Sequence, residues 1–418
     1  MSLRQDIIAL AQRAKHAATV LAALSTARKN QALRQMATTL RAGTATVLRA
    51  NATDVASATS RKLTPALVDR LALTPQRIVE MCVSLEEVAR LPDPVGEVVK
   101  AWERPNGLRI KRVRVPLGVI GIIYESRPNV TADCAGLCLK SGNAVILRGG
   151  SEAIQSNRAI ARLLQQALRL TQLPPAAVTL IPSTERAGVD ILLGLTPYVD
   201  LIIPRGGQAL IDNVTRRSKI PVVKHDKGIC HVYVDEQANL QMAEEIAFNA
   251  KVQRPATCNA METLLVHERV AQTFLPRMAD RLRQAGVELR GDAPTRKLVR
   301  WVTPATERDW ATEYLDLILS VRVVKNLEQA IAHIRRYGSQ HSDAIVTDDP
   351  SRAEQFLQAV DSACVYVNAS TRFTDGYQFG LGAEIGISTN KLHARGPMAL
   401  EELTTYKYLV YGQGQVRQ

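Results

Sequence analysis

One cysteine has neighbours that favour chemistry over packing. Cys258 lies in the segment 254–260, RPATCNA, between two small polar residues and four positions after an arginine. Nearby positive charge increases the ionised fraction of a thiol, and the thiolate is the nucleophilic form. The alternative is a small hydrophobic residue at the end of a loop, and the local sequence alone leaves both interpretations open.

Two glycine pairs follow arginines where apolar runs end. Residues 147–151 read LRGGS and residues 203–207 read IPRGG, and a helical pattern follows each. Backbone N–H groups at a helix N-terminus bind anions, so both loops are candidates for nucleotide phosphates, although any single glycine pair could be a plain loop. The predicted cofactor-binding residues are Arg148, Gly149, Gly150, Ser151, Pro204, Arg205, Gly206 and Gly207.

The remaining cysteines and histidines predict no metal and no disulfide framework. Six cysteines are scattered over 418 residues, without a CxxC pair or a zinc-type Cys/His spacing. Cys134 and Cys138 lie four residues apart, which favours packing on one helix face. The pair Cys230-His231 has no further ligand nearby.

The charge balance leaves a second class of function open. The formal net charge of +13 is compatible with nucleic-acid binding, but the densest basic run, 104–114, alternates with apolar residues as a strand does. Aromatic residues make up 4%, which is few for base stacking. We therefore favour a positive field that attracts a small acidic substrate, or a merely solvated surface, and expect no nucleic acid.

Nothing in the chain resembles a membrane span, because no apolar run approaches 18 residues. The N-terminal residues follow an amphipathic pattern that includes Asp6, which indicates a helix rather than a signal peptide and weakens a transit-peptide interpretation. We expect no membrane association and a cytoplasmic location, where free thiols persist.

The elements that must position these residues form two α/β patterns. Residues 1–90 show helical spacing, and 98–115 show near alternation around Asn106-Gly107, which predicts a basic hairpin. Strands expected at 119–123, 144–147, 178–181, 199–203 and 220–223 alternate with helices at 130–140, 149–170, 185–193 and 206–217. A second series has strands at 231–234, 262–266, 317–324, 343–347 and 364–368, and helices at 238–250, 268–285, 326–336 and 350–360.

Repeated βα units with continuous apolar strands predict doubly wound parallel sheets. The fold class is α/β, with a second α/β domain and a small β extension. We predict a cofactor-binding domain at 1–95 and 117–224, a catalytic domain at 225–394, and oligomerisation segments at 96–116 and 395–418.

Three motifs resemble one known family. They are the nucleophile segment 252–260, the run 324–345 with HI, YGS and HSD, and the run 119–129, VIGIIYESRPN. Together they resemble the aldehyde dehydrogenase superfamily over nearly the whole chain, and within it the branch that reduces glutamyl phosphate in proline biosynthesis.

The resemblance implies roles for individual residues. Cys258 falls where the superfamily has its nucleophile, and Glu313 aligns with the glutamate that holds the nicotinamide ribose. Arg148 replaces a lysine of the cofactor loop, which implies a contact with the 2′-phosphate of NADPH. The oxyanion asparagine falls on or next to Ser126, so we assign the oxyanion to the backbone N–H of Cys258 and to Asn259.

One departure from the superfamily narrows the chemistry. Hydrolytic members carry a glutamate that activates water, whereas residues 223–228 read VKHDKG. Asp226 could act as a base, but its basic neighbours favour anion binding. The predicted substrate-binding residues are Arg127, Lys224, His225 and Lys227.

The expected reaction is therefore NADPH-dependent reduction of L-glutamyl 5-phosphate to L-glutamate 5-semialdehyde, with release of phosphate, through a thioester on the cysteine. The resemblance also implies a homo-oligomer, either a dimer or a tetramer, and functional coupling to the kinase that makes glutamyl phosphate. Another phosphorylating or CoA-acylating aldehyde dehydrogenase would share these features.

Overall fold

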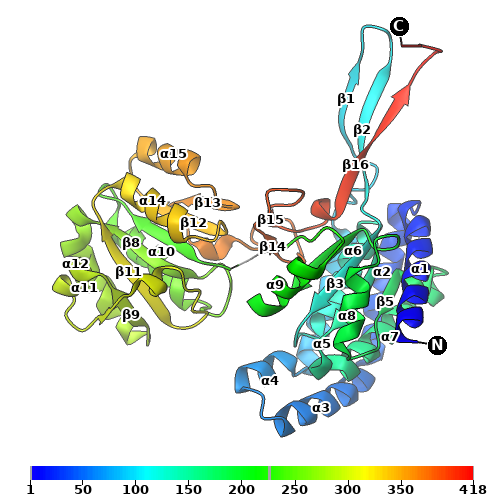
Figure 1. Ribbon diagram of the computed structural model, residues 1–418, viewed down its shortest axis with the longest axis horizontal. Coiled ribbons are helices and arrows are strands. Elements are labelled where there is room, and N and C mark those ends of the chain that lie inside the picture. The colour runs from blue at the N-terminus through cyan, green and yellow to red at the C-terminus, as the bar shows by residue number, and fades with distance from the viewer. Residues whose placement is uncertain (1, 225–226, 418) are drawn as a thin grey trace. The chain divides into compact units, whose positions relative to one another are not determined.

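The computed structural model describes residues 2–417 apart from 225 and 226 (Figure 1). The chain divides into two compact units. The first unit comprises Met1–Lys224, Gly380–Gly386 and Met398–Gln418, and the second comprises His225–Phe379 and Ile387–Pro397.

Helices occupy the first 90 residues of the first unit, as the leucine and alanine spacing predicts. They are α1 (Leu3–Ala22), α2 (Thr26–Ala42), α3 (Thr44–Ser60), α4 (Pro65–Leu71) and α5 (Pro75–Arg90). Side-chain caps fix several starts; the Thr74 side chain, for example, accepts the N–H of Arg77 at the start of α5.

A four-stranded parallel sheet forms the centre of the first unit, in the order β5-β4-β3-β6. Its strands are β3 (Val119–Tyr124), β4 (Ala144–Gly149), β5 (Val178–Leu180) and β6 (Leu201–Arg205), and its helices are α6 (Asn129–Lys140), α7 (Ile154–Leu170), α8 (Arg186–Leu193) and α9 (Gln208–Arg217), with 3₁₀ turns at Ser151–Ala153 and Pro175–Ala177. The order reverses after β5, so the predicted doubly wound parallel sheet is confirmed.

The expected strand at 220–223 is wrong. Only an isolated bridge joins Ile202 to Val222. Pro221 lacks the N–H that a continued ladder needs, although its carbonyl still accepts the N–H of Ile202 at 2.9 Å.

A separate three-stranded antiparallel sheet in the first unit has the order β1-β2-β16. It pairs the hairpin strands β1 (Val98–Glu103) and β2 (Arg109–Pro116) with the C-terminal strand β16 (Thr404–Tyr411), which follows a 3₁₀ turn at Glu401–Leu403. Tyr406 lies beneath the guanidinium groups of Arg112 and Arg114, with ring distances of 4.7 and 5.3 Å. Basic and aromatic side chains thus stabilise a sheet that exposes Tyr408.

The second unit contains a seven-stranded parallel sheet in the order β10-β9-β11-β8-β7-β12-β13. Its strands are β7 (Cys230–Val234), β8 (Met261–His267), β9 (Glu288–Gly291), β10 (Thr303–Pro304), β11 (Ile318–Val324), β12 (Ser342–Val346) and β13 (Cys364–Val367). Its helices are α10 (Leu240–Val252), α11 (Glu268–Gln284), α12 (Ala293–Leu298), α13 (Glu307–Trp310), α14 (Leu327–Tyr337) and α15 (Pro350–Ala359), with a 3₁₀ turn at Thr371–Phe373 and a short ladder of β14 (Ile387–Ser388) and β15 (Gly396–Pro397).

The apolar side chains of this sheet form a core with α10 and α11 that includes Leu264, Phe274 and Met278. Within the described part of the chain, no helix combines the length and apolar character needed to cross a membrane.

Candidate active site

The Cys258 loop joins α10 to β8 at the amino end of the second unit's sheet. The hydroxyl of Thr257 donates to the carbonyl of Arg254 at 2.8 Å, and the N–H of Ala260 donates to the carbonyl of Thr257 at 3.0 Å. Cys258 is partly exposed, whereas the other five cysteines are buried. The loop therefore presents one accessible thiol on a tightly hydrogen-bonded turn.

Gly228 packs directly against the backbone of the nucleophile. A Cβ atom at this position would lie 1.8 Å from the carbonyl oxygen of Cys258 and 2.5 Å from its carbonyl carbon. The buried thiol of Cys230 also donates to the carbonyl oxygen of Cys258, at 3.3 Å. The start of β7 and the nucleophile loop thus form one close backbone contact, which only glycine permits at residue 228.

The predicted ribose ligand Glu313 is held beside this contact. Its Oε1 accepts the N–H of Gly228 at 2.7 Å. Burial raises the pKa of Glu313, while the hydrogen bond from Gly228 and the charge of Lys227 oppose the rise. The second unit therefore connects Cys258 to Glu313 through Gly228.

A buried ion pair joins the two ends of the Cys258 loop. Lys251 and Glu262 have fully buried side chains 2.6 Å apart, seven residues before and four after Cys258. The second carboxylate oxygen of Glu262 accepts the N–H of Leu315, at 3.1 Å. Leu315 has a positive φ of 53°, a strained conformation that this hydrogen bond helps to hold. Burial raises the pKa of Glu262 to about 7.

The pair was not among the predicted site residues. A signal was present, because the charged residues Lys251 and Glu262 flank the nucleophile loop and each directly follows an apolar residue.

The side chain of Asn259 already uses both of its polar atoms in hydrogen bonds within the protein. Its Nδ2 donates to the carbonyl of Thr374 at 2.8 Å, and its Oδ1 accepts the hydroxyl of Thr257 at 3.0 Å. The side chain thus anchors the 370–374 turn, and of this residue only the backbone N–H is left as a candidate oxyanion donor. Asn259 lies next to Cys258 in the second unit.

Ser126, the other predicted catalytic residue, lies in the first unit. Its N–H and its hydroxyl both donate to Oε1 of Glu152, at 2.7 and 2.8 Å. The residue has a positive φ of 39°, so the carboxylate of Glu152 holds a strained turn directly after β3. The hydroxyl of Ser126 is directed at this carboxylate.

The first predicted cofactor loop is organised by its arginine. The guanidinium of Arg148 donates to the carbonyls of Gly149 and Thr184, at 2.8 and 3.1 Å, while its Nε is buried without a hydrogen-bond partner. Burial lowers the pKa of Arg148. A Cβ on Gly150 would lie 2.0 Å from Oε1 of Glu152, so a larger residue in this loop, which continues into Ser151, would require the Glu152 side chain to move.

The second predicted loop, after Pro204 and Arg205, already contains an anion. The N–H of Gly207 at the start of α9 donates to Oε2 of Glu125 at 2.8 Å, and a Cβ on Gly206 would lie 2.4 Å from the same oxygen. A carboxylate therefore stands where a phosphate is expected. Glu125 was not predicted, although an acidic residue directly after a fully buried strand is a usable signal.

The predicted substrate-binding residues divide between the units. Arg127 and Lys224 belong to the first unit, and Lys227, an exposed side chain, belongs to the second. His225, like Asp226, lies outside the described residues.

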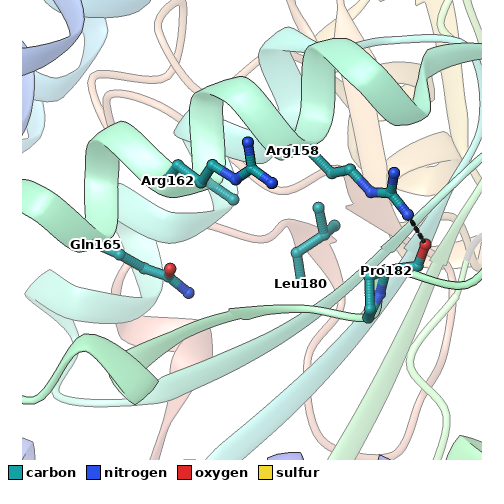
Figure 2. A pocket seen from close by; sticks show the side chains of 6 residues that line it. Arg158, Arg162, Gln165, Leu180 and Pro182 are labelled. Atoms are coloured by element: carbon teal, nitrogen blue, oxygen red, sulfur yellow. Dashed lines mark hydrogen bonds between the residues drawn. The ribbon is translucent and has the colours of Figure 1, made fainter.

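A cavity of about 310 Å³ lies beside the first unit's sheet, between α7 and the segment that contains β5 (Figure 2). Arg158 and Arg162 extend from α7 over Leu180, and Arg158 donates to the carbonyl of Pro182 at 2.6 Å. Arg158 and Arg148 thus hold two carbonyls of the same connection, 182–184, which borders the first cofactor loop.

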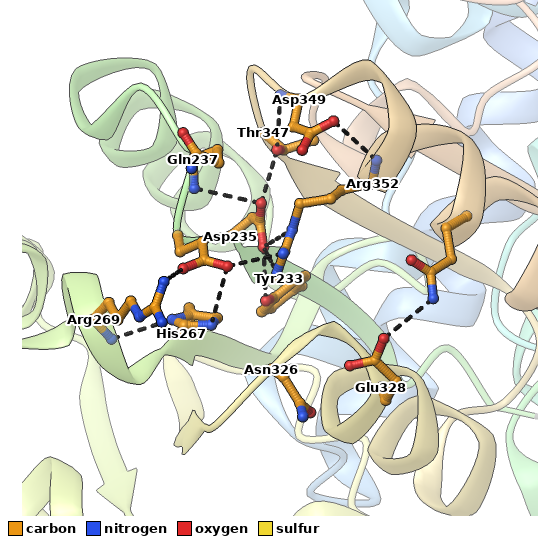
Figure 3. Close-up of polar contacts among 12 residues, drawn as sticks. Tyr233, Asp235, Gln237, His267, Arg269, Asn326, Glu328, Thr347, Asp349 and Arg352 are labelled. Atoms are coloured by element: carbon orange, nitrogen blue, oxygen red, sulfur yellow. Dashed lines mark hydrogen bonds and ion pairs between the residues drawn. The ribbon is translucent and has the colours of Figure 1, made fainter.

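Ion pairs and hydrogen bonds join the side chains at the carboxyl edge of the second unit's sheet (Figure 3). The fully buried carboxylate of Asp235 pairs with Arg352 at 2.8 Å and accepts the hydroxyls of Tyr233 and Thr347, each at 2.9 Å. Parallel sheets usually bind ligands at this edge. In this unit the accessible thiol lies at the opposite, amino edge.

Comparison with known proteins identifies the family of the chain. Residues 2–296 match the aldehyde dehydrogenase family. The gamma-glutamyl phosphate reductase of Moorella thermoacetica is 56% identical over 418 residues, which cover 100% of each chain. That of Carboxydothermus hydrogenoformans is 56% identical over 412 residues, 99% of each chain.

Solved structures show the same relationship. The crystal structure of gamma-glutamyl phosphate reductase from Thermotoga maritima matches with a TM-score of 0.97 and 51% identity, covering 99% of this chain and 100% of that one. An acetylating aldehyde dehydrogenase from Geobacillus thermoglucosidasius, at 17% identity, has a similar fold with a TM-score of 0.69 over 100% of this chain and 98% of its own. The resemblance inferred from the motifs and the predicted fold class are confirmed.

Proposed function

Because the chain belongs to the aldehyde dehydrogenase family, and within it to the gamma-glutamyl phosphate reductases, we propose that it reduces L-glutamyl 5-phosphate to L-glutamate 5-semialdehyde, with release of phosphate, in L-proline biosynthesis. The observation that carries this proposal is the accessible Cys258 thiol, held against Gly228 and beside Glu313.

The reaction begins with the Cys258 thiolate attacking the acyl carbon of the substrate. The backbone N–H groups of Cys258 and Asn259 are assigned to the oxyanion, and preorganised donors of this kind contribute about 3 kcal/mol each to the barrier reduction. As the tetrahedral intermediate collapses, the C–O bond to phosphate breaks, its electron pair stays on the phosphate oxygen, and a thioester remains on Cys258.

The thioester must survive until it is reduced. Residues 223–228, VKHDKG, contain no glutamate that could activate a water molecule for hydrolysis. Loss of the acyl group as glutamate is therefore slow, and the thioester is available for reduction. After reduction, the thiohemiacetal releases the semialdehyde and restores the thiol.

The residues present fit a nicotinamide cofactor. The close-packed glycines of the first loop, the unpartnered Nε of Arg148 and the backbone N–H of Gly207 at the N-terminus of α9, which at present donates to Glu125, are features of a phosphate cradle. When bound, the cofactor supplies the hydride that reduces the thioester carbon. Arg148 supports a preference for NADPH, because a guanidinium suits the 2′-phosphate, and Glu313 is assigned to the nicotinamide ribose.

The proposal extends to assembly and location. The exposed face of β16 and the basic hairpin support a homo-oligomer, either a dimer or a tetramer, and the lability of an acyl phosphate supports coupling to the kinase that makes it. A cytoplasmic location follows from the need for a reduced Cys258.

The test compares wild type with Cys258→Ala, and with Cys364→Ala as the control for a buried cysteine outside the site. We expect Cys258→Ala to abolish NADPH-dependent reduction of glutamyl phosphate and Cys364→Ala to retain it. Near wild-type activity of Cys258→Ala would exclude catalysis through this thiol. Running wild type with NADPH and NADH in parallel measures the cofactor preference.

A further inference from the structure

The guanidinium of Arg372 bridges the two ends of the nucleophile loop. Its Nε donates to Oε1 of Gln253 at 2.8 Å, and a terminal nitrogen donates to Oδ1 of Asn259. Gln253 directly follows α10 and Asn259 directly follows Cys258. The charge of Arg372 is therefore fixed across the loop that carries the thiol.

The backbone of Arg372 is fixed to the same loop. Nδ2 of Asn259 donates to the carbonyls of Thr374 and Arg372, at 2.8 and 3.4 Å. The hydroxyl of Thr371, in turn, donates to the carbonyl of Asn259 at 2.7 Å. Because both the guanidinium and the backbone of Arg372 are hydrogen-bonded to the nucleophile loop, its side chain is held in place beside Cys258.

Arg372 forms no ion pair with any described carboxylate, although the charge of Asp375 acts on it at longer range. Both of its side-chain acceptors are neutral amides, and among the described residues no carboxylate lies within ion-pair distance of it. The side chain is partly buried, and burial together with the charge of Arg254 lowers the pKa of Arg372, while the charges of Cys258 and Asp375 oppose the fall. By contrast, the partly buried Arg352 pairs with both Asp235 and Glu236.

A second cation accompanies it. Arg254 lies four residues before Cys258, and its exposed side chain makes no hydrogen bond or ion pair with any described residue. Arg372 and Arg254 are close enough to interact electrostatically, and neither forms an ion pair with a described residue. Their mutual repulsion raises the free energy of the site. A bound anion with two negative charges would offset that cost.

We propose that Arg372 and Arg254 bind the phosphate group of the acyl phosphate. This inference rests on the proposed function, because the phosphate is then bonded to the carbon that Cys258 attacks. Guanidinium groups match phosphate oxygens in geometry and charge. As the S–C bond forms and the C–O bond to phosphate breaks, the two arginines stabilise the charge left on the departing phosphate.

The reverse reaction separates the two halves of the substrate. Semialdehyde and inorganic phosphate are then independent reactants, each with its own KM. Because Arg372→Gln removes a charge-assisted hydrogen bond to the phosphate, it should raise the KM for phosphate at least about tenfold. The KM for semialdehyde should not change. Arg372→Lys keeps the charge but loses the planar fork, so its phosphate KM should lie between those of wild type and Arg372→Gln.

Arg254→Gln and Arg277→Gln complete the set. Arg254 does not bridge the loop, so its substitution should raise the phosphate KM without affecting thermal stability. Arg277 already pairs with Glu244 and is the matched control, for which neither KM should change. A purely structural role of Arg372 would lower kcat and stability and leave the phosphate KM of Arg254→Gln unchanged.

The inference is overturned if either Arg372→Gln or Arg254→Gln leaves the phosphate KM unchanged, or if the KM for semialdehyde rises instead. Either result is distinct from failure of the proposed function, which would appear as semialdehyde oxidation by wild type that needs no phosphate.

Discussion

Adding one methyl group at residue 228 should displace the nucleophile. In Gly228→Ala the new Cβ would lie 1.8 Å from the carbonyl oxygen of Cys258, and both sides of the contact are backbone. Ordinary van der Waals contact begins near 3.4 Å. Relief of the clash therefore requires a relative movement of roughly 1.6 Å, the difference between 3.4 and 1.8 Å.

A shift of that size has a predictable kinetic effect. A misplacement of about 1 Å in a reacting group can lower the rate about 100-fold, so we expect kcat/KM of Gly228→Ala to fall at least about 100-fold. That corresponds to about 2.7 kcal/mol of transition-state stabilisation. The N–H of Gly228 also donates to Glu313, so the KM for the cofactor should rise as well.

The assay is phosphate-dependent oxidation of semialdehyde, with the rate of Cys258 alkylation by iodoacetamide as a direct report on the thiol. Gly194→Ala is the control, because its Cβ would meet nothing closer than 3.6 Å. Thermal unfolding of both variants separates local displacement from global unfolding. A folded Gly228→Ala enzyme with wild-type kcat/KM and wild-type alkylation would refute the inferred contact.

Three further predictions follow from buried or capping charges. Glu262→Gln leaves Lys251 buried without its counter-charge and should lower the free energy of unfolding, measured in urea, by about 3 kcal/mol. Adding Lys251→Met to this variant should recover part of the loss, and equal stability of the single and the double variant would contradict the prediction. Burial would raise the pKa of Asp309, but its hydrogen bonds outweigh burial and hold that pKa below the ordinary value of 3.8. The contribution of Asp309 to folding stability is therefore complete above pH 3.8 and is lost as the pH falls further. Asp309→Asn should flatten the acid side of the curve of stability against pH, and an unchanged slope would be evidence against this role. Glu125→Gln replaces the carboxylate that accepts the N–H of Gly207 with a weaker acceptor, so a phosphate of the cofactor competes better for that N–H. Calorimetry should show NADP⁺ binding about fivefold more tightly. Weaker binding would mean that the carboxylate supports the cofactor.

The local pattern of apolar residues was sufficient to predict the strands that carry the site. The strands β3, β4, β7 and β8 are mainly apolar because almost all of their residues are buried, and they were predicted within a residue or two. The segment 288–310 was missed, because β9 and α13 are four residues each and β10 is two, too short to show a period. The neighbours of Cys258 made it a candidate nucleophile, and this role stays a prediction.

The contacts that define the site's geometry join distant segments. Asn259 reaches Thr374 and Arg372 across more than 110 residues, and Ser126 reaches Glu152 across 26. No local period or propensity encodes which side chains meet after folding. The sequence therefore indicated which residue types were available, whereas the commitment of Asn259, the occupied N-terminus of α9 and the unpaired charge of Arg372 required the structure.

The central claim is that Cys258 carries an acyl group that phosphate, not water, removes. It is tested most directly by mixing the enzyme with semialdehyde and NADP⁺ without phosphate and following NADPH formation. The account predicts a burst of about one NADPH per chain that then stops, resumes when phosphate is added, and is absent in Cys258→Ala. Steady turnover without phosphate, or a burst in Cys258→Ala, would contradict it.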